Sequence, residues 1–242
     1  MKRQKIRRLS LLISLLLFPV IMWYLSPALI VQAAFEHIVN GSFIVFIGLF
    51  ISSLFLGRAW CGYICPAGGL QECATRVNEN PAKQGKRRNI KYVIWGLMIV
   101  AVIVMFFIGK GVVKVDFFYM TDHGISVTET FNYIIYYAVI LLLLVPSLIH
   151  GKRAACHYLC WMAPFMILGG KLGRLMHLPQ LHVEAKKENC VSCGKCNKEC
   201  PMGLDVLKMI QTGQNATNVD CINCGACVDA CKKDVLSFAM KR

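Results

Sequence analysis

The chain has 242 residues, of which 56% are hydrophobic and 17% are charged, and its mean hydropathy is +0.53. Soluble globular domains carry about 25% charged residues, so this composition argues against both an ordinary soluble domain and a disordered chain. Of the net charge of +14, residues 182–242 carry little, because nine Lys or Arg face seven Asp or Glu there. Basic residues that lie between apolar segments are typical of a membrane protein, so we expect contact with a lipid bilayer and no nucleic-acid partner.

Four uncharged apolar segments are near the length that crosses a bilayer as a helix, which is about 20 residues. They comprise residues 9–35, 38–57, 92–109 and 131–149. The first is the longest and contains Pro19 and Pro27, which predict a kinked or tilted helix. Its basic start also resembles a signal peptide, but its apolar stretch exceeds a signal core of about 7–15 residues, which favours a retained anchor.

The basic residues predict the orientation of these four spans, because positive residues accumulate on the cytoplasmic side. Five precede the first span, and seven lie between the second and third, namely Arg58, Arg76, Lys83, Lys86, Arg87, Arg88 and Lys91. We therefore expect a multi-pass protein of the cell (cytoplasmic) membrane, with both the N- and the C-terminus in the cytoplasm. Since that compartment is reducing, tail cysteines are expected to bind metal before they form disulfides.

Two cysteine runs with the same spacing occupy the tail. Each reads C-x2-C-x2-C-x3-C, the pattern that binds [4Fe–4S] clusters in bacterial ferredoxins, where the fourth cysteine ligates the partner cluster. Turns at Gly194 and Gly225 help the first three thiolates to wrap one cluster. Paired CxxC motifs also bind zinc, but two matching runs of four disfavour it. The predicted ligand sets are Cys190, Cys193, Cys196 and Cys231 for one cluster, and Cys221, Cys224, Cys227 and Cys200 for the other.

Two further cysteine pairs belong to an internal repeat in the apolar region. The segment GRAWCGYICPAG aligns with GKRAACHYLCWMAP at an offset of 95 residues, so a two-span hairpin that ends in CxxxC occurs twice. Cysteines at i and i+4 share one helix face, so two such helices can present four thiols to one another. A third metal centre, a redox-active thiol pair and plain packing of small apolar residues are all open here. The four residues are Cys61, Cys65, Cys156 and Cys160, whereas Cys73 is expected to be a bystander.

Four spans, a CGYICP motif, a second CxxxC and two terminal ferredoxin runs together resemble the NapH/NosR-type membrane-bound polyferredoxins. The resemblance covers nearly the whole chain. It implies a 4Fe-4S integral membrane protein that passes electrons between a quinone pool and a partner reductase within a membrane complex, with both CxxxC pairs as the family's membrane motifs. Two features depart from that pattern: Trp161 follows Cys160 where the family has proline, and only short outer loops stand where larger members carry a flavin-bearing domain.

These observations predict an all-α transmembrane domain over residues 1–181, with four helices in duplicated two-helix hairpins, and a small α+β dicluster ferredoxin-like domain over residues 182–242. The predicted function is an electron relay through two [4Fe–4S] clusters and the membrane cysteines, between a cytoplasmic redox protein partner and a quinone or another membrane or extracytoplasmic acceptor. A quinone pocket on the cytoplasmic side would be lined by Trp60, Tyr63, Tyr158 and Trp161, although these aromatics also suit an interfacial belt. The alternatives are a copper reductase or assembly factor, because soft thiolates prefer Cu(I), and a structural anchor for a larger complex.

Overall fold

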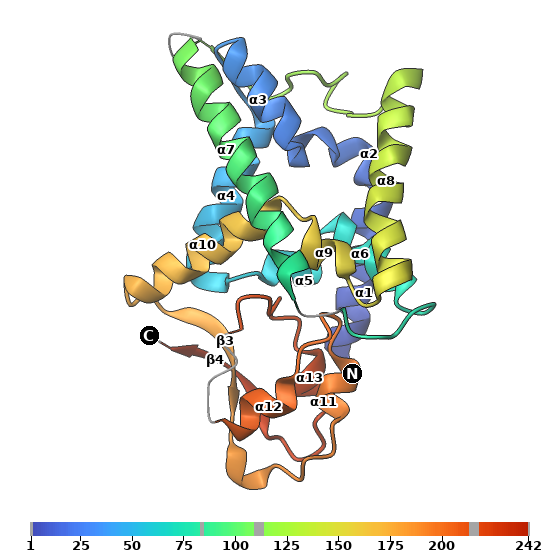
Figure 1. Ribbon diagram of the computed structural model, residues 1–242, viewed down its shortest axis with the longest axis vertical. Coiled ribbons are helices and arrows are strands. Elements are labelled where there is room, and N and C mark those ends of the chain that lie inside the picture. The colour runs from blue at the N-terminus through green and yellow to red at the C-terminus, as the bar shows by residue number, and fades with distance from the viewer. Residues whose placement is uncertain (1, 83–84, 109–113, 213–217, 242) are drawn as a thin grey trace.

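The computed structural model describes residues 2–82, 85–108, 114–212 and 218–241, so Lys83 of the basic segment lies outside the described residues. The chain is mostly helical, and a smaller tail with a two-stranded sheet lies at one end of the helices (Figure 1). This arrangement agrees with the predicted order of a helical part followed by a small α+β part.

The first apolar segment is broken into short pieces, so the single kinked helix predicted there is wrong. Pro19 lies in the first turn of one piece and Pro27 begins another. Proline has no N–H group to donate within a helix, which is why both are found where a helix starts. The pieces are α1 (Lys2–Leu16), α2 (Phe18–Ile21), η1 (Trp23–Leu25) and α3 (Pro27–Phe35).

Backbone carbonyls released at this break are satisfied by distant side chains. The Ser42 hydroxyl oxygen lies 2.9 and 2.8 Å from the carbonyl oxygens of Trp23 and Ser26, which share its one proton. The indole N–H of Trp161 donates to the Leu25 carbonyl at 3.1 Å. A broken helix is stable within an apolar region only when such groups find partners inside the protein. The break is therefore part of the fold.

Two of the four predicted spans are single helices long and apolar enough to cross a membrane, among the described residues. One is the stretch Arg87–Ile108, which comprises most of η2 (Lys86–Asn89) and all of α7 (Ile90–Ile108). The other is α8 (Thr130–His150). Only 11% of the most apolar window of each is buried, so neither is the core helix of a compact domain. The second predicted span is α4 (Gly41–Leu56), whose 16 residues fall short of a straight span.

The internal repeat is visible where α4 and α8 end. Both helices close at a glycine with positive φ, Gly57 at +58° and Gly151 at +92°, a conformation that side chains disfavour. A five-residue helix with the first cysteine of the motif follows, and the second cysteine precedes a further helix. These helices are α5 (Ala59–Tyr63) and α6 (Pro66–Ala74) in the first repeat, and α9 (Ala154–Tyr158) and α10 (Met162–Leu175) in the second.

In its described residues, the tail has an antiparallel pair of strands, the 3-10 turn η3 (Lys187–Asn189) and three short helices. These are α11 (Lys195–Glu199), α12 (Val206–Gln211) and α13 (Ala226–Ala230). Strand β3 (Gln180–Ala185) pairs with β4 (Leu236–Lys241). The Gln180 side chain donates to the carbonyls of Leu54 and Gly170 at 2.8 and 2.9 Å, so β3 is tied to α4 and α10. A separate parallel pair joins β1 (Ile38–Asn40) to β2 (Lys114–Asp116).

Buried ion pairs lock α1 onto both cysteine motifs. Arg7 and Arg153 are 2% and 0% exposed, and each guanidinium lies 2.6 Å from a carboxylate oxygen of Glu72 on α6. Arg7 also donates to the carbonyl of Gly62, and Arg153 to that of Cys61. Because a buried charge requires a partner, these three side chains form one unit that joins α1, α6 and α9.

We predict that Glu72→Gln lowers the free energy of unfolding by about 3–5 kcal/mol, because it leaves two arginines buried without a charge partner. Denaturant unfolding of the detergent-solubilised protein at pH 7, followed by tryptophan fluorescence, measures this change. Glu79→Gln is the control, since Glu79 is exposed and its loss changes stability by about 0.5 kcal/mol or less. Equal effects of the two substitutions would contradict the prediction.

The same ion pairs predict a pH dependence. Burial alone raises the pKa of Glu72, but Arg153 and Arg7 outweigh it and hold the pKa below its ordinary value of 4.5. The stabilisation is therefore complete above pH 4.5 and is lost as the pH falls through the lowered pKa of the folded state. Unfolding curves from pH 7 to pH 3 should show a smaller loss of stability in Glu72→Gln than in the wild type.

Candidate metal centres

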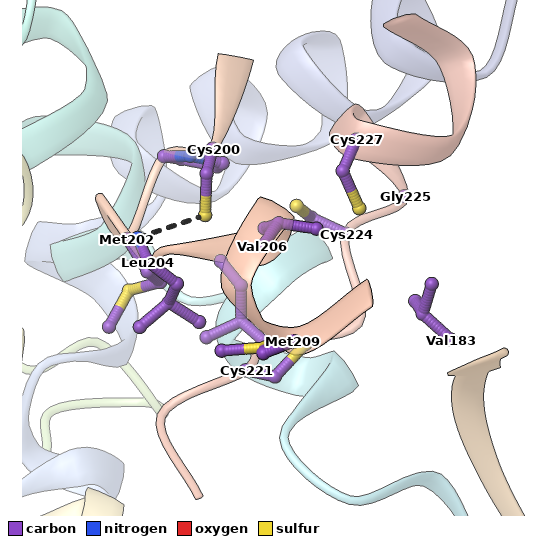
Figure 2. Close-up of a pocket in the computed structure, with 12 residues that line it drawn as sticks. Val183, Cys200, Met202, Leu204, Val206, Met209, Cys221, Cys224, Gly225 and Cys227 are labelled. Atoms are coloured by element: carbon purple, nitrogen blue, oxygen red, sulfur yellow. Dashed lines mark hydrogen bonds between the residues drawn. The ribbon is translucent and has the colours of Figure 1, made fainter. Parts of the chain in front are cut away.

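Four of the eight tail cysteines line one small cavity between α12, α13 and the strand β3 (Figure 2). Cys200 follows α11, whereas Cys221, Cys224 and Cys227 come from the loop before α13 and from its first turn. Apolar side chains such as Val206 close the cavity. These cysteines are the set that the sequence predicts for one cluster, in which Cys200 is contributed by the first run.

The loop that carries this set has the same backbone geometry as the loop of the first run. Gly194 and Gly225 both adopt positive φ, at +71° and +70°, and each caps the helix that follows. Ser192 and Asn223, at equivalent positions, are also left-handed, at +54° and +48°. Such turns direct successive backbone N–H groups inward, where they can bond to sulfur. The Leu204 N–H lies 3.4 Å from Cys200 Sγ.

The other predicted set is brought together in part. Burial raises the pKa of the Cys196 thiol, and the charges of Cys190 and Cys193 raise it further, so these three lie close together. Cys231, at the end of α13, packs against the same apolar core as Cys190. Among the described residues no three Cys, His, Asp or Glu side chains meet closely enough to hold a single metal ion. In a cubane each thiolate binds a different iron.

Both CxxxC pairs lie near enough to influence one another electrostatically, and we name them the four-cysteine group: Cys61, Cys65, Cys156 and Cys160. No three of these described side chains lie close enough to hold a single metal ion. The first three of the four cysteines are buried, each 6% exposed, and Cys160 is half-buried. Burial raises the pKa of Cys65, and the charges of the other three raise it further. Burial likewise raises the pKa of Cys160 to about 12, with contributions from Cys156 and Cys61. Without a metal these thiols are therefore protonated, and a metal would have to displace the protons.

The thiols do not come from single helix faces, so the prediction that each CxxxC pair lies along one helix is wrong. Helix α5 ends before Cys65, which instead caps α6, because Pro66 cannot continue the preceding helix. Helix α9 likewise ends before Cys160. The four cysteines converge from the broken ends of helices, where the chain turns sharply.

An identical turn forms in both repeats even though Trp161 replaces the proline of the first. In each repeat two successive N–H groups, the second from the cysteine itself, donate to one carbonyl oxygen, which is typical of a helix C-terminus. The distances are 2.9 and 3.1 Å from Ile64 and Cys65 to Trp60, and 2.9 and 3.0 Å from Leu159 and Cys160 to Ala155. The second motif therefore stays in register with the first, although it lacks the proline.

Buried arginines at equivalent positions of the repeat flank the four-cysteine group. Arg58 and Arg153 are 3% and 0% exposed. Burial raises the pKa of Cys156, and the charges of these two arginines partly oppose that rise. In the described part of the chain, the Nε–H groups of both arginines and the indole N–H of Trp60 are buried without an acceptor. A buried donor without an acceptor is unfavourable. These donors therefore fit an anionic centre, such as metal-bound thiolate and sulfide.

Two further side chains that the sequence analysis did not single out contact the group. The Gln71 amide, 0% exposed, donates to Cys156 Sγ at 3.1 Å and accepts from the Cys156 N–H at 3.1 Å. The Met166 sulfur lies 3.6 Å from Cys61 Sγ. No local pattern marks either residue, because both reach the site only through packing between helices.

The four-cysteine group adjoins the tail cavity. A Cβ atom at Gly62 would lie 2.5 Å from the Ile222 carbonyl oxygen and 3.5 Å from the Cα of Cys224. The Tyr63 hydroxyl donates to the Cys224 carbonyl at 3.3 Å. Cys61 also belongs to the same apolar core as Cys224. The first CxxxC motif therefore packs directly on a loop that carries predicted cluster ligands.

Asp220, directly before Cys221, anchors this loop to the helices. Its carboxylate is fully buried, accepts from Lys91 at 2.8 Å and Arg58 at 3.2 Å, and is also paired with Arg88. Burial alone would raise the pKa of Asp220, but Arg58 and Lys91 lower it to about 2. His157 lies nearby, and burial lowers its pKa to about 4, so its ring is neutral at pH 7. Four separate segments thus meet at one carboxylate.

The aromatic residues proposed for a quinone pocket make internal contacts. Tyr63 bonds to the tail, Trp161 bonds to Leu25, and Tyr158 is only 5% exposed. Trp60 packs against the core that contains Cys61. The quinone pocket and the interfacial belt both stay predictions.

Two family models match separate parts of the chain. One, described as a 4Fe-4S binding domain, matches residues 41–87, and the other, described as a 4Fe-4S dicluster domain, matches residues 171–242. The second range contains all eight tail cysteines, and the first contains Cys61 and Cys65. Cys156 and Cys160 lie outside both ranges. The matches support an iron–sulfur protein with a ferredoxin-like dicluster domain.

A curated protein of Escherichia coli (strain K12), named "Putative electron transport protein YccM", is 25% identical over 221 residues. The alignment covers 82% of this chain and 56% of that protein, so the chain spans about half the length of this relative. No solved structure matches the chain. Together with the family models, this similarity supports electron transfer through 4Fe–4S domains, whereas the narrower NapH/NosR-type assignment depends on the motifs of the sequence.

We predict that Cys224→Ser removes one tail cluster, and with it about four iron atoms per chain, because a cubane needs all of its thiolate ligands. Iron and acid-labile sulfide measured on anaerobically purified protein test this loss. Cys73→Ser is the matched control, since Cys73 is exposed and belongs to neither predicted ligand set of the tail. A full iron content in Cys224→Ser would remove this residue from the ligand set.

Proposed function

We propose that this protein is a multi-pass protein of the cytoplasmic membrane, with both termini in the cytoplasm, that relays electrons through three metal centres. Two [4Fe–4S] clusters bound by the eight tail cysteines exchange electrons with a cytoplasmic redox protein. The four-cysteine group holds the third centre and passes electrons toward a quinone or another membrane or extracytoplasmic acceptor. The exposed apolar surfaces of α7 and α8 support membrane insertion.

The observation that carries this proposal is the direct contact between the two kinds of cysteine site. Electron tunnelling falls steeply with distance, so consecutive centres in a relay must lie close together. Gly62, between the cysteines of the first motif, touches the backbone of Ile222 and Cys224, and only glycine leaves room for that approach. A structural anchor would have no need for this contact.

Charge balance supports a metal at the four-cysteine group. Among the described residues, four buried cations share two carboxylates where the CxxxC motifs meet the tail, an excess of two positive charges. These groups are Arg7, Arg58, Lys91, Arg153, Glu72 and Asp220, and Arg58 and Arg153 act directly on the thiols. Uncompensated charge inside a protein is strongly unfavourable. Protonated thiols do not compensate it, whereas a cluster held by four thiolates is a net anion. Arg153 and Arg58 also influence the tail cysteines Cys224 and Cys221, which supports cations shared between the two cysteine sites.

Iron is the metal that we favour. The range matched by the 4Fe-4S binding model contains Cys61, Cys65 and Cys73, and the structure leaves Cys73 exposed while it brings Cys156 and Cys160 to the other two. An iron–sulfur centre would thus be completed across the internal repeat. When bound, it supplies one-electron chemistry. The four cysteines would hold it away from water, and the buried N–H groups without an acceptor could donate to it.

We predict that the quadruple variant Cys61→Ser, Cys65→Ser, Cys156→Ser, Cys160→Ser loses iron but keeps both tail clusters. The wild type should contain about ten to twelve iron atoms per chain, and the variant about eight. Iron analysis and EPR of anaerobically purified proteins measure this difference, and the tail-cluster signals of the variant show that it folds. Eight iron atoms and the same spectra in both proteins would exclude an iron centre at the four-cysteine group.

We also predict that Gly62→Ala slows the transfer of electrons from the tail clusters to the four-cysteine group. The added methyl forces the loop at Ile222 away, and overpacking of this kind lowers stability by about 1–3 kcal/mol. Freeze-quench EPR after rapid reduction follows the order in which the centres are reduced. Gly48→Ala is the control, because a Cβ atom there meets nothing within 4 Å. Unchanged kinetics in Gly62→Ala would contradict the proposed route.

The second candidate function is copper reduction or copper-site assembly, with the copper ion as substrate. The observation that favours it is the Met166 thioether beside Cys61, because thioether and thiolate together form a soft set that suits Cu(I). This function predicts about eight iron atoms in the wild type. It also predicts stoichiometric Cu(I) binding that the quadruple variant loses and that Met166→Leu weakens, whereas the iron centre predicts little effect of Met166→Leu on iron content.

A further inference from the structure

A cleft of about 840 Å³ lies where α1, α6 and the tail meet, in the region of Figure 1 where α1 comes down beside α11 and α13. Residues of α1 and α6 form one wall, and residues of α11 and α13 form the other. We name it the basic cleft after the six cations that line it without an ion-pair partner among the described residues: Lys5, Arg8, Arg76, Lys152, Lys195 and Lys198.

The charge of the basic cleft is strongly unbalanced. Its lining also contains four acids, but two are neutralised, since Glu72 binds Arg7 and Arg153, and Asp229 binds Arg3 at 2.7 Å. Only the exposed Glu79 and Glu199 oppose the six cations, which leaves an excess of four positive charges. Such an excess at an exposed surface attracts a negatively charged partner over a distance of about 10 Å at moderate salt.

The basic cleft borders both tail cluster sites. Lys195 and Lys198 flank Cys196 on α11, and Pro201 follows Cys200. On the same wall, Ala226 and Ala230 of α13 directly precede Cys227 and Cys231. A partner seated in the cleft therefore rests on the two helices that carry predicted ligands of both clusters.

We propose that the basic cleft docks the acidic face of a small soluble electron carrier. This inference rests on the proposed function and names the side of the tail at which electrons enter or leave. A small-molecule site is lined mainly by apolar groups, with a few convergent polar ones, whereas five of the six cations here are exposed. Exposed cations around a concave surface are typical of electrostatic steering between proteins, which raises the association rate more than the affinity.

The charges come from the helical part and the tail together, which favours a protein over lipid headgroups. Lys195 and Lys198 belong to the tail, beside the cluster sites, and Arg8 and Arg76 belong to the opposite wall. An anionic lipid would need only the wall that continues into the apolar surface of α1, which includes Leu12. A carrier protein uses both walls.

The test follows electron transfer from a reduced plant-type [2Fe–2S] ferredoxin, a small acidic protein, to the full-length protein in detergent by stopped-flow absorbance. The double variant Arg8→Gln, Arg76→Gln alters two cations distant in sequence from any predicted ligand. We expect its second-order rate constant at low ionic strength to fall about tenfold, with a weaker dependence on salt. Lys195→Gln, Lys198→Gln on the other wall should have a similar effect.

The matched control is Lys186→Gln, Lys187→Gln, which removes the same charge from an exposed part of the tail outside the cleft. Equal rates in the Arg8, Arg76 variant, the control and the wild type would overturn the proposal. So would an unchanged ferredoxin rate combined with lost binding to phosphatidylglycerol vesicles, which would assign the cleft to lipid headgroups. Reduction by dithionite should be unaffected in every variant. If the wild type accepts electrons from ferredoxin but none reach the four-cysteine group, the relay fails while the docking site stands.

Discussion

The joint between the helices and the tail depends on a set of buried charges. Two carboxylates, Glu72 and Asp220, receive four buried cations from α1, α5, α7 and α9. In an interior of low polarity such charges are stable only as pairs. If one partner is removed, the other remains buried without a counter-charge, and its desolvation penalty is no longer offset. The same groups hold α1 on α6 and hold the loop of Cys221 on the helices. The same buried ion pairs therefore position the cysteine sites and set the charge around them.

This joint distinguishes the tail from a ferredoxin on a flexible tether. The side chains of Gln180 and Asn223 donate to backbone carbonyls in the last turn of α4. Gly62 packs on the loop of Cys224. A fixed contact of this kind keeps the two cysteine sites at one distance, whereas a tethered domain would sample many. This geometry suits the proposed relay, in which the internal step would be built into the fold and exchange with a soluble carrier would take place at the surface.

The internal repeat has diverged in the partners of its arginines. Arg58 and Arg153 occupy equivalent positions, and each has a buried Nε–H without an acceptor among the described residues. Arg58 pairs with Asp220 of the tail, whereas Arg153 pairs with Glu72 of the helical part. Both copies of the motif nevertheless contact the tail, the first through Gly62 and the second through His157, whose ring lies 2.9 Å from the Met202 carbonyl. The duplicated unit thus supplies two cysteine pairs and two buried arginines with different carboxylate partners.

The sequence alone determined the tail sites, because metal ligation at C-x2-C-x2-C is a local property of short turns, and Gly194 and Gly225 adopt the positive φ expected of them. It also showed the repeat and its cysteine pairs. The broken first segment, the sharp turns before Cys65 and Cys160, and the roles of Gln71 and Asp220 were decided only by the tertiary structure. The reason is physical: a helix breaks, or a carboxylate is buried, only where distant side chains satisfy the exposed backbone groups and charges, and no local pattern records such partners.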